Sequence, residues 1–309
     1  MHGNNSLKIA ILAVLLIAAL LTSGCIKGLG GTTTTGKGVV ILDFKPDFTQ
    51  VHSGDKVKLQ LRVQNTGEVK ARNVKAEIAG IDLSEWRGRS TGENLGDLLG
   101  VDKATNTPGA VRTKYWELTA PSLPAGTSFK YEPIVKVSYD YKTTAVKAIT
   151  LVDSDELRRI IQQGRRLEVK PVETSAGPLD VEVQTGEFVR TGRRDVDYDI
   201  FPLYIKVINT LWEQGGTVVP KTTRGGDYPV QLKITLPQGT TFVHTGYGSD
   251  CGRLVTVDLW QGKDAEITCE VRVTRPPEYR QDKLINIELD YRYQVEASTE
   301  IEVVGTRTR

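Results

Sequence analysis

The chain has 309 residues, of which 39% are hydrophobic and 25% are charged, so it is long enough to bury a core and to form two domains. Its 40 basic and 38 acidic residues nearly cancel, which excludes the large positive excess that is usual in a nucleic-acid-binding protein. We therefore predict no nucleic acid among its partners.

Residues 1–25 have the pattern of a signal peptide or a membrane anchor. Lys8 precedes a run without polar side chains from Ile9 to Leu21, and small residues then lead to Cys25. At about 1.5 Å per residue the apolar run covers roughly 20 Å, which is short of a ~30 Å bilayer core and favours cleavage over spanning. The pattern predicts a protein anchored on the outer face of the cytoplasmic membrane or at the cell surface.

The junction Thr22-Ser23-Gly24-Cys25 resembles the lipobox of exported lipoproteins, although Thr22 stands where that family usually has leucine. The resemblance implies that Cys25 becomes the first mature residue and carries lipid. The alternative is an uncleaved transmembrane anchor in which Cys25 is incidental, and it leaves the protein on the same side of the membrane.

Residues 26–38 are rich in glycine and threonine, which predicts a flexible linker. From residue 39 the apolar period is two: Val57, Leu59 and Leu61 alternate with polar residues, as in a half-buried strand. Several such runs with turn signals between them predict a β-sandwich over residues 39–152.

Residues 153–164 are predicted to form a short connecting helix. Asp153 or Ser154 caps its N-terminus, and Leu157, Ile160 and Ile161 lie on one face that must dock on a neighbouring domain. We place a domain boundary at this helix.

Residues 165–309 repeat the first half. Leu59 to Thr66 corresponds to Leu203 to Thr210, with the Asn-Thr dipeptide retained. The clearest match has a constant offset of 152 positions and relates Tyr139, Tyr141, Ala145, Ile149 and Val152 to Tyr291, Tyr293, Ala297, Ile301 and Val304. A second match, of Leu123 and Gly126 with Leu259 and Gly262, predicts an insertion in the second copy near residues 275–280.

Three turn motifs resemble those of the immunoglobulin-like, cell-adhesion-related domains of archaeal and bacterial surface proteins: Ser53-Gly54-Asp55-Lys56, Asn65-Thr66-Gly67 and Leu123-Pro124-Ala125-Gly126. The resemblance implies an all-β fold with two tandem immunoglobulin-like β-sandwiches. It also implies a structural or adhesive module without common catalytic residues.

If Cys25 carries lipid, two cysteines remain. Cys251 and Cys269 are the even number that a disulfide requires outside the cytoplasm, whereas two buried thiols are the alternative.

Ser90 lies in the G-x-S-x-G pattern Gly88-Arg89-Ser90-Thr91-Gly92, but the surrounding sequence lacks the strand and helix that expose a catalytic serine. We expect a surface loop there. Asp195, Asp197 and Asp199 alternate on one strand face and are weak candidates for a cation site, with an arginine-balanced edge as the favoured interpretation.

The tryptophans Trp86, Trp116, Trp212 and Trp260 are expected in the core or at strand ends, with carbohydrate stacking as the alternative.

The sequence thus predicts a membrane-tethered, non-catalytic structural or binding protein of the cell envelope that needs no cofactor. Its partners are the membrane, another envelope protein or itself, and carbohydrate is a further candidate. An accessory subunit that docks on a membrane complex or surface filament by β-strand addition is the main alternative. An envelope hydrolase that uses Ser90 is a distant one.

Overall fold

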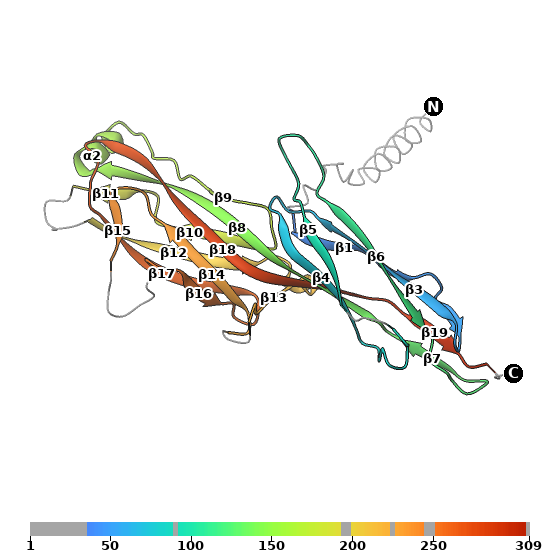
Figure 1. The fold of residues 1–309 in the computed structure, drawn as a ribbon. Helices are drawn as coiled ribbons and strands as arrows, with labels where there is room; N and C mark the ends of the chain where they lie inside the picture. Colours follow the sequence, from blue (N-terminus) through green and yellow to red (C-terminus); the bar gives the residue numbers. More distant parts are fainter. Residues whose placement is uncertain (1–35, 89–91, 193–198, 223–225, 244–250, 307–309) are drawn as a thin grey trace, which may run out of the picture. The chain divides into compact units, whose positions relative to one another are not determined.

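A computed structural model describes residues 36–88, 92–192, 199–222, 226–243 and 251–306, which belong to one compact unit (Figure 1). Cys25, Ser90, Asp195 and Asp197 lie outside the described residues. Within the ranges that are described, no helix is long and apolar enough to cross a membrane.

The described part of the first half is made of strands followed by a helix. These are β1 (Val39–Pro46), β2 (Gln50–His52), β3 (Lys56–Asn65), β4 (Ala71–Ala79), β5 (Gly92–Leu98), β6 (Val111–Thr119), β7 (Ser128–Tyr131), β8 (Ile134–Asp153) and α2 (Ser154–Gln162).

The described part of the second half is also built mostly of strands. Its elements are β9 (Val172–Thr174), β10 (Leu179–Gln184), β11 (Val189–Thr191), β12 (Asp199–Asn209), the 3-10 helix η1 (Trp212–Gln214), β13 (Thr217–Val219), β14 (Pro229–Thr235), β15 (Thr240–Phe242), β16 (Val255–Asp258), β17 (Asp264–Val273), β18 (Arg280–Ser298) and β19 (Ile301–Val304).

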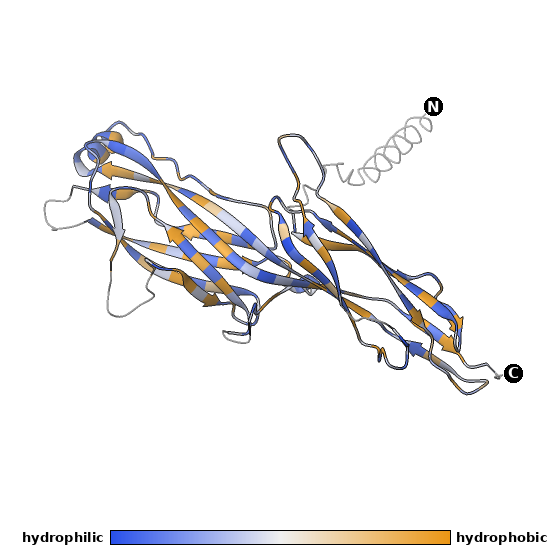
Figure 2. Cartoon of the chain, in the orientation of Figure 1, coloured by the Kyte–Doolittle hydropathy of each residue, from blue (hydrophilic) through white to orange (hydrophobic). Residues whose placement is uncertain are grey.

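The strands form because apolar and polar residues alternate, so that one face of each strand is buried. In β3, Val57, Leu59, Leu61 and Val63 are fully buried, while the residues between them face outward. Figure 2 shows the same alternation along the other strands. The predicted all-β class with one short helix is confirmed for the described residues.

The two longest strands, β8 and β18, pair antiparallel along almost their whole length, from Ile134 opposite Ser298 to Val152 opposite Arg280. They lie in the middle of a sheet with the order β16-β14-β18-β8-β4-β5. Two further sheets, β1-β3-β6 and β10-β12-β17-β15, contain equivalent strands of the two copies, and β2-β19-β7 completes the fold.

The duplicated tyrosines face one another across this pair. Tyr139 lies opposite Tyr293, and Tyr141 lies opposite Tyr291, although the repeat equates Tyr139 with Tyr291 and Tyr141 with Tyr293. Exchanging the two copies therefore reproduces the same pairing. The copies are related by a local pseudo-two-fold axis that passes between Asp140 and Arg292.

The two copies exchange strand ends about this axis. The last residues of the second copy, in β19, pair with β2 and β7 of the first copy, for example Val303 with Val51. In the same way the end of β8 pairs with β11 of the second copy, where Leu151 lies opposite Val189. Each half therefore contains a strand segment that the other half supplies.

The exchange changes the predicted domain organisation. The large sheet contains strands from both halves, and one contiguous cluster of buried hydrophobic side chains runs from Val39 to Val303. The predicted division into two tandem immunoglobulin-like sandwiches at residues 39–152 and 165–309 is not confirmed, because neither half keeps all of its strands.

Helix α2 begins with the predicted cap, but the prediction that it connects two domains is not confirmed. The Asp153 side chain accepts hydrogen bonds from the backbone N–H groups of Asp155 and Glu156 and so caps the helix. Leu157 and Ile160 are buried against Val152, while Ile161, which was expected on the same face, is 63% exposed. The helix follows β8 at the end of the pair where β18 begins.

The extra residues of the second copy are not where the sequence placed them. Strands β6 and β17 are equivalent, because they pair with β3 and β12 respectively. The segment 259–263 before β17 therefore corresponds to residues 99–110 before β6, and not to residues 123–126. The second copy is instead longer between β12 and β14, where η1 and β13 are added.

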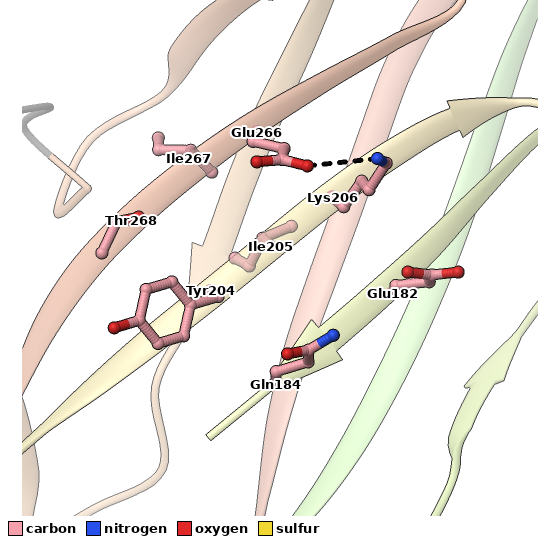
Figure 3. A pocket seen from close by; sticks show the side chains of 8 residues that line it. All are labelled: Glu182, Gln184, Tyr204, Ile205, Lys206, Glu266, Ile267 and Thr268. Carbon is pink, nitrogen blue, oxygen red and sulfur yellow. Dashed lines mark ion pairs between the residues drawn. The ribbon is translucent and has the colours of Figure 1, made fainter. Parts of the chain in front are cut away.

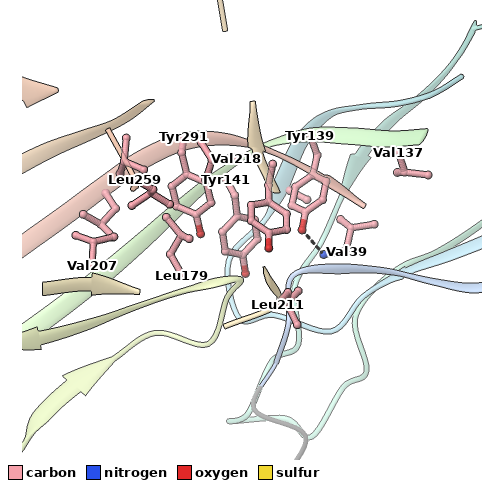
Figure 4. Packing of buried hydrophobic residues seen from close by; sticks show 14 of the residues in the cluster. Val39, Val137, Tyr139, Tyr141, Leu179, Val207, Leu211, Val218, Leu259 and Tyr291 are labelled. Atoms are coloured by element: carbon pink, nitrogen blue, oxygen red, sulfur yellow. Dashed lines mark hydrogen bonds between the residues drawn. The ribbon is translucent and has the colours of Figure 1, made fainter. Parts of the chain in front are cut away.

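The four tyrosines at the axis form one buried cluster (Figure 4). Their ring centroids are 6.0 to 6.2 Å apart from strand to strand and along each strand. Each hydroxyl has a partner: Tyr139 accepts from Val39 N, Tyr141 donates to Ala176 O, Tyr291 pairs with Thr143 Oγ1, and Tyr293 donates to Asn209 Oδ1. Burial raises the pKa of Tyr141 to about 12 and the pKa values of the other three as well, so all four are protonated at neutral pH.

Two buried asparagines, Asn65 and Asn209, hold equivalent turns in the two copies. Each amide group donates to two backbone carbonyls, and each side-chain oxygen accepts a backbone N–H two residues further on. The carbonyls belong to Val69 and Leu98 for Asn65, and to Gly216 and Gly262 for Asn209. The repeated Asn-Thr dipeptide thus has a structural reason.

Replacing either asparagine by alanine is expected to destabilise the protein by roughly 2–4 kcal/mol, because buried backbone groups lose their partners. Urea unfolding should show a loss for both Asn65→Ala and Asn209→Ala, and the larger loss for Asn209→Ala, because the buried Tyr293 hydroxyl loses its partner as well. Asn94→Ala, at an exposed position, is the matched control and should change little. A loss confined to one of the two buried sites would contradict the equivalence.

The ion pair on the axis predicts a pH-dependent loss of stability in Arg292→Ala. Burial alone would raise the pKa of Asp140, but hydrogen bonds from Arg292 (2.9 Å) and Asn73 (2.8 Å) hold it below its ordinary value. A lowered carboxyl pKa contributes stability above the ordinary pKa, and this contribution is lost as the pH falls through the lowered one.

Arg292→Ala should therefore lose about 1–2 kcal/mol at pH 7, and the difference from the wild type should shrink below about pH 4. Urea unfolding at several pH values measures this. Lys130→Ala, which breaks an exposed pair with Glu300, is the control and should show no such pH dependence. A constant difference from pH 7 to pH 3 would contradict the assignment.

Candidate binding surfaces

Cys251 and Cys269 form a disulfide, with their Cα atoms 6.0 Å apart. The alternation of β17 turns Cys269 inward, and both residues are buried. The pairing that the cysteine count predicted is present, and the alternative of two buried thiols does not hold.

Asp199 is the first residue of β12 and the one predicted acidic candidate that the structure describes. It is buried, and its Oδ2 atom accepts a hydrogen bond from Gly192 N at 2.8 Å. In the described ranges no group of three histidine, cysteine or acidic residues is placed to hold a metal ion. The prediction for Asp195 and Asp197 is untested.

The outer face of β10, β12 and β17 carries a groove of about 180 Å³, drawn in Figure 3. The Lys206 Nζ atom lies 2.9 Å from Asp264 Oδ2 and 3.1 Å from Glu266 Oε1. The hydrogen bond that Lys206 donates to Asp264 is the main reason why the pKa of Lys206 is raised. Tyr204 stands beside this network and is 49% exposed. The groove is smaller than typical small-molecule sites and suits contact with a macromolecular surface.

Strand β6 has a free edge. It pairs with β3 on one side, and no other strand of the described part pairs with it. The Thr119 N–H donates to Trp86 O at 2.8 Å, away from β3, so the N–H groups of Glu117 and Tyr115 point to the same open side.

A groove of about 460 Å³ lies beside this edge, with residues of β6 and Glu93 of β5 in its wall. The Lys114 Nζ atom lies 3.0 Å from Glu93 Oε2 and bridges the two strands. Among the residues that the structure describes, the Trp116 indole N–H has no hydrogen-bond partner, although this residue is only 4% exposed. The sequence does not predict this site, because the alternation of apolar and polar residues identifies a strand but does not show which strands lie beside it.

The tryptophans divide into two pairs. Trp86 and Trp116 are buried as expected, whereas Trp212 is 41% and Trp260 is 73% exposed. The Trp212 indole N–H donates to Gln261 O at 3.1 Å, and the Lys263 Nζ atom lies 3.9 Å from the Trp212 ring centroid. Trp212 and Trp260 are therefore not in the core, but both lie close to strand ends, Trp212 after β12 and Trp260 after β16.

No protein-family profile and no curated protein matches the chain. Among solved structures it is weakly similar to the envelope protein VP37 of White Spot Syndrome Virus, with 9% identity over 50% of this chain and 97% of the other and a TM-score of 0.25. A protein of unknown function from Porphyromonas gingivalis W83 matches with 12% identity over 76% and 83% and a TM-score of 0.19. The collagen adhesin CNA of S. aureus matches with 10% identity over 86% and 92% and a TM-score of 0.12. TM-scores this low do not establish a shared fold, so these structures do not indicate a function for the chain.

Removing the disulfide in a Cys251→Ala/Cys269→Ala double variant should cost about 3 kcal/mol, because the bond closes a loop between positions 18 apart. Urea unfolding with and without a reductant measures this. The reductant should lower the unfolding midpoint of the wild type and leave that of the variant unchanged. Equal midpoints for the two proteins without reductant would contradict the prediction.

Proposed function

We propose that this chain is a membrane-tethered, extracytoplasmic structural or binding protein of the cell envelope that acts through protein contacts and not through catalysis. The observation that carries the proposed location is the Cys251–Cys269 disulfide, since such bonds persist mainly outside the cytoplasm. The N-terminal pattern that ends at Cys25 agrees with it.

The groove on the outer face of β10, β12 and β17 supports a function that depends on contact with another protein. The groove has a volume of only about 180 Å³, and its Lys206 and Glu266 side chains are paired with each other. Such a surface resembles the polar rim of a protein interface. Crosslinking on intact cells tests the proposal: a ladder of multiples or a discrete heteromeric band supports it, and the absence of any crosslinked product contradicts it.

A second candidate function, docking by β-strand addition, is favoured by the free edge of β6. An added strand would pair with the outward N–H and C=O groups of Tyr115 and Glu117, and its side chains would enter the groove beside Trp116. A backbone carbonyl or polar side chain of the incoming strand would satisfy the Trp116 indole.

Tyr115→Pro tests strand addition, because proline removes an N–H that points away from β3 and is tolerated at a strand edge. We expect the heteromeric crosslinked band to disappear while the melting temperature stays near that of the wild type. Tyr115→Ala, which keeps the N–H, is the matched control and should keep the band. If both variants keep it, the partner does not bind at this edge.

A further inference from the structure

Trp212, Trp260 and Lys263 lie in two neighbouring loops of the second copy, which are joined by the hydrogen bond from Trp212 to Gln261 O, and we call these three residues the tryptophan patch. Trp260 is the most exposed of the large hydrophobic side chains in the described residues, at 73%. It lies in the short segment before β17, and Trp212 lies in η1, within the part of the second copy that has no counterpart in the first.

The patch is held rigidly. Asn209 donates one hydrogen bond to Gly216 O after η1 and another to Gly262 O beside Trp260, so one buried side chain fixes both loops. The bond from Trp212 to Gln261 O joins the loops a second time. An exposed indole on a fixed loop loses little conformational entropy when it binds.

The patch lies where the linker joins the folded body. The Lys37 Nζ atom donates to Gln214 Oε1 at 2.8 Å, and Val39 N donates to Tyr139 at the pseudo-two-fold axis. Residues 26–36 separate Cys25 from Lys37. A segment of eleven residues can span at most about 40 Å.

We propose that the tryptophan patch rests on the headgroup region of the lipid bilayer and sets the orientation of the body on the membrane. This proposal rests on the proposed membrane tether. Tryptophan favours the membrane interface, because its ring is apolar and its N–H is polar, and the ring of Trp260 is exposed. Because the tether keeps the body within a few nanometres, a weak interaction is sufficient.

Carbohydrate stacking is less favoured by the same contacts. The Trp212 N–H is bonded to Gln261 O, and the Lys263 ammonium covers one face of the Trp212 ring. These contacts engage the polar groups of Trp212 and Lys263 that would otherwise orient a sugar. A bilayer needs fewer directed hydrogen bonds, because it is bound mainly by burial of the exposed indole.

The test uses the full chain in phosphatidylcholine vesicles, prepared with and without bromine on the acyl chains near the headgroups. Bromine quenches tryptophan emission at short range. We expect quenching in the wild type and its loss in Trp212→Phe/Trp260→Phe, which retains the buried Trp86 and Trp116.

A matched control adds Tyr279→Trp to that double variant. Tyr279 is 55% exposed, and its carbonyl accepts from Asp153 N at the far end of β8. At about 3.3 Å per strand residue this end lies on the order of 45 Å from Tyr139, so the new tryptophan should not be quenched.

Flotation of the vesicles separates failure of this proposal from failure of the tether. If the chain floats with the vesicles and the wild type is not quenched, the patch does not contact the bilayer. Equal quenching in the Tyr279→Trp control would also overturn the orientation. A shift of Trp260 emission by soluble oligosaccharides, without bromine quenching, would make the patch a carbohydrate site instead. A chain that does not float refutes the tether and this proposal with it.

Discussion

The pairing of β8 with β18 is the constraint on which the rest of the structure depends. The two strands bring equivalent tyrosines of the two copies together, and burial of four aromatic rings in one cluster is a large hydrophobic contribution. Each hydroxyl must then find a partner, because an unpaired polar group in the core would be costly. The partners come from strands and turns of both halves, including Val39 and Asn209. The cluster therefore fixes how the two halves meet.

The tyrosine cluster also determines where the exposed loops of the two copies lie. Asn209 connects Tyr293 to the loops that carry Trp212 and Trp260. Asn65 holds the equivalent turn next to the end of β5, at Leu98. Duplication makes the frame symmetric, but the two surfaces differ. The first copy has the longer segment before β6, and the second has the addition between β12 and β14. Differences between the copies thus fall on loops, where binding sites usually lie.

Several features follow from the sequence because they depend on local chemistry. The alternation from Val57 to Val63 predicts a strand, Asp153 predicts a helix cap, and the constant offset between Tyr139 and Tyr291 predicts the duplication. The strand and the helix cap each need a few neighbouring residues, and the duplication needs only the comparison of two stretches of the sequence. The disulfide follows from the number of cysteines and the compartment.

The arrangement of the two copies does not follow from the sequence in the same way. A repeat shows which positions are alike, but Tyr139 is paired with Tyr293 and not with its equivalent Tyr291. The short Leu-Gly match that equated residues 123–126 with 259–262 also failed, because strand pairing and not composition decides equivalence. The free edge of β6 and the exposure of Trp260 depend on which strands lie alongside, and this is a property of the whole fold.

We infer from the exchanged strands that the two halves form one cooperative unit. Hydrogen–deuterium exchange of the backbone amides, followed strand by strand through increasing urea, tests it most directly. If the two halves unfold together, β3 and β6 should lose protection at the same urea concentration as β12 and β17, and β8 and β18 should lose it there as well. Loss of protection in one half, while the other half and its part of the β8–β18 pair stay protected, would contradict it.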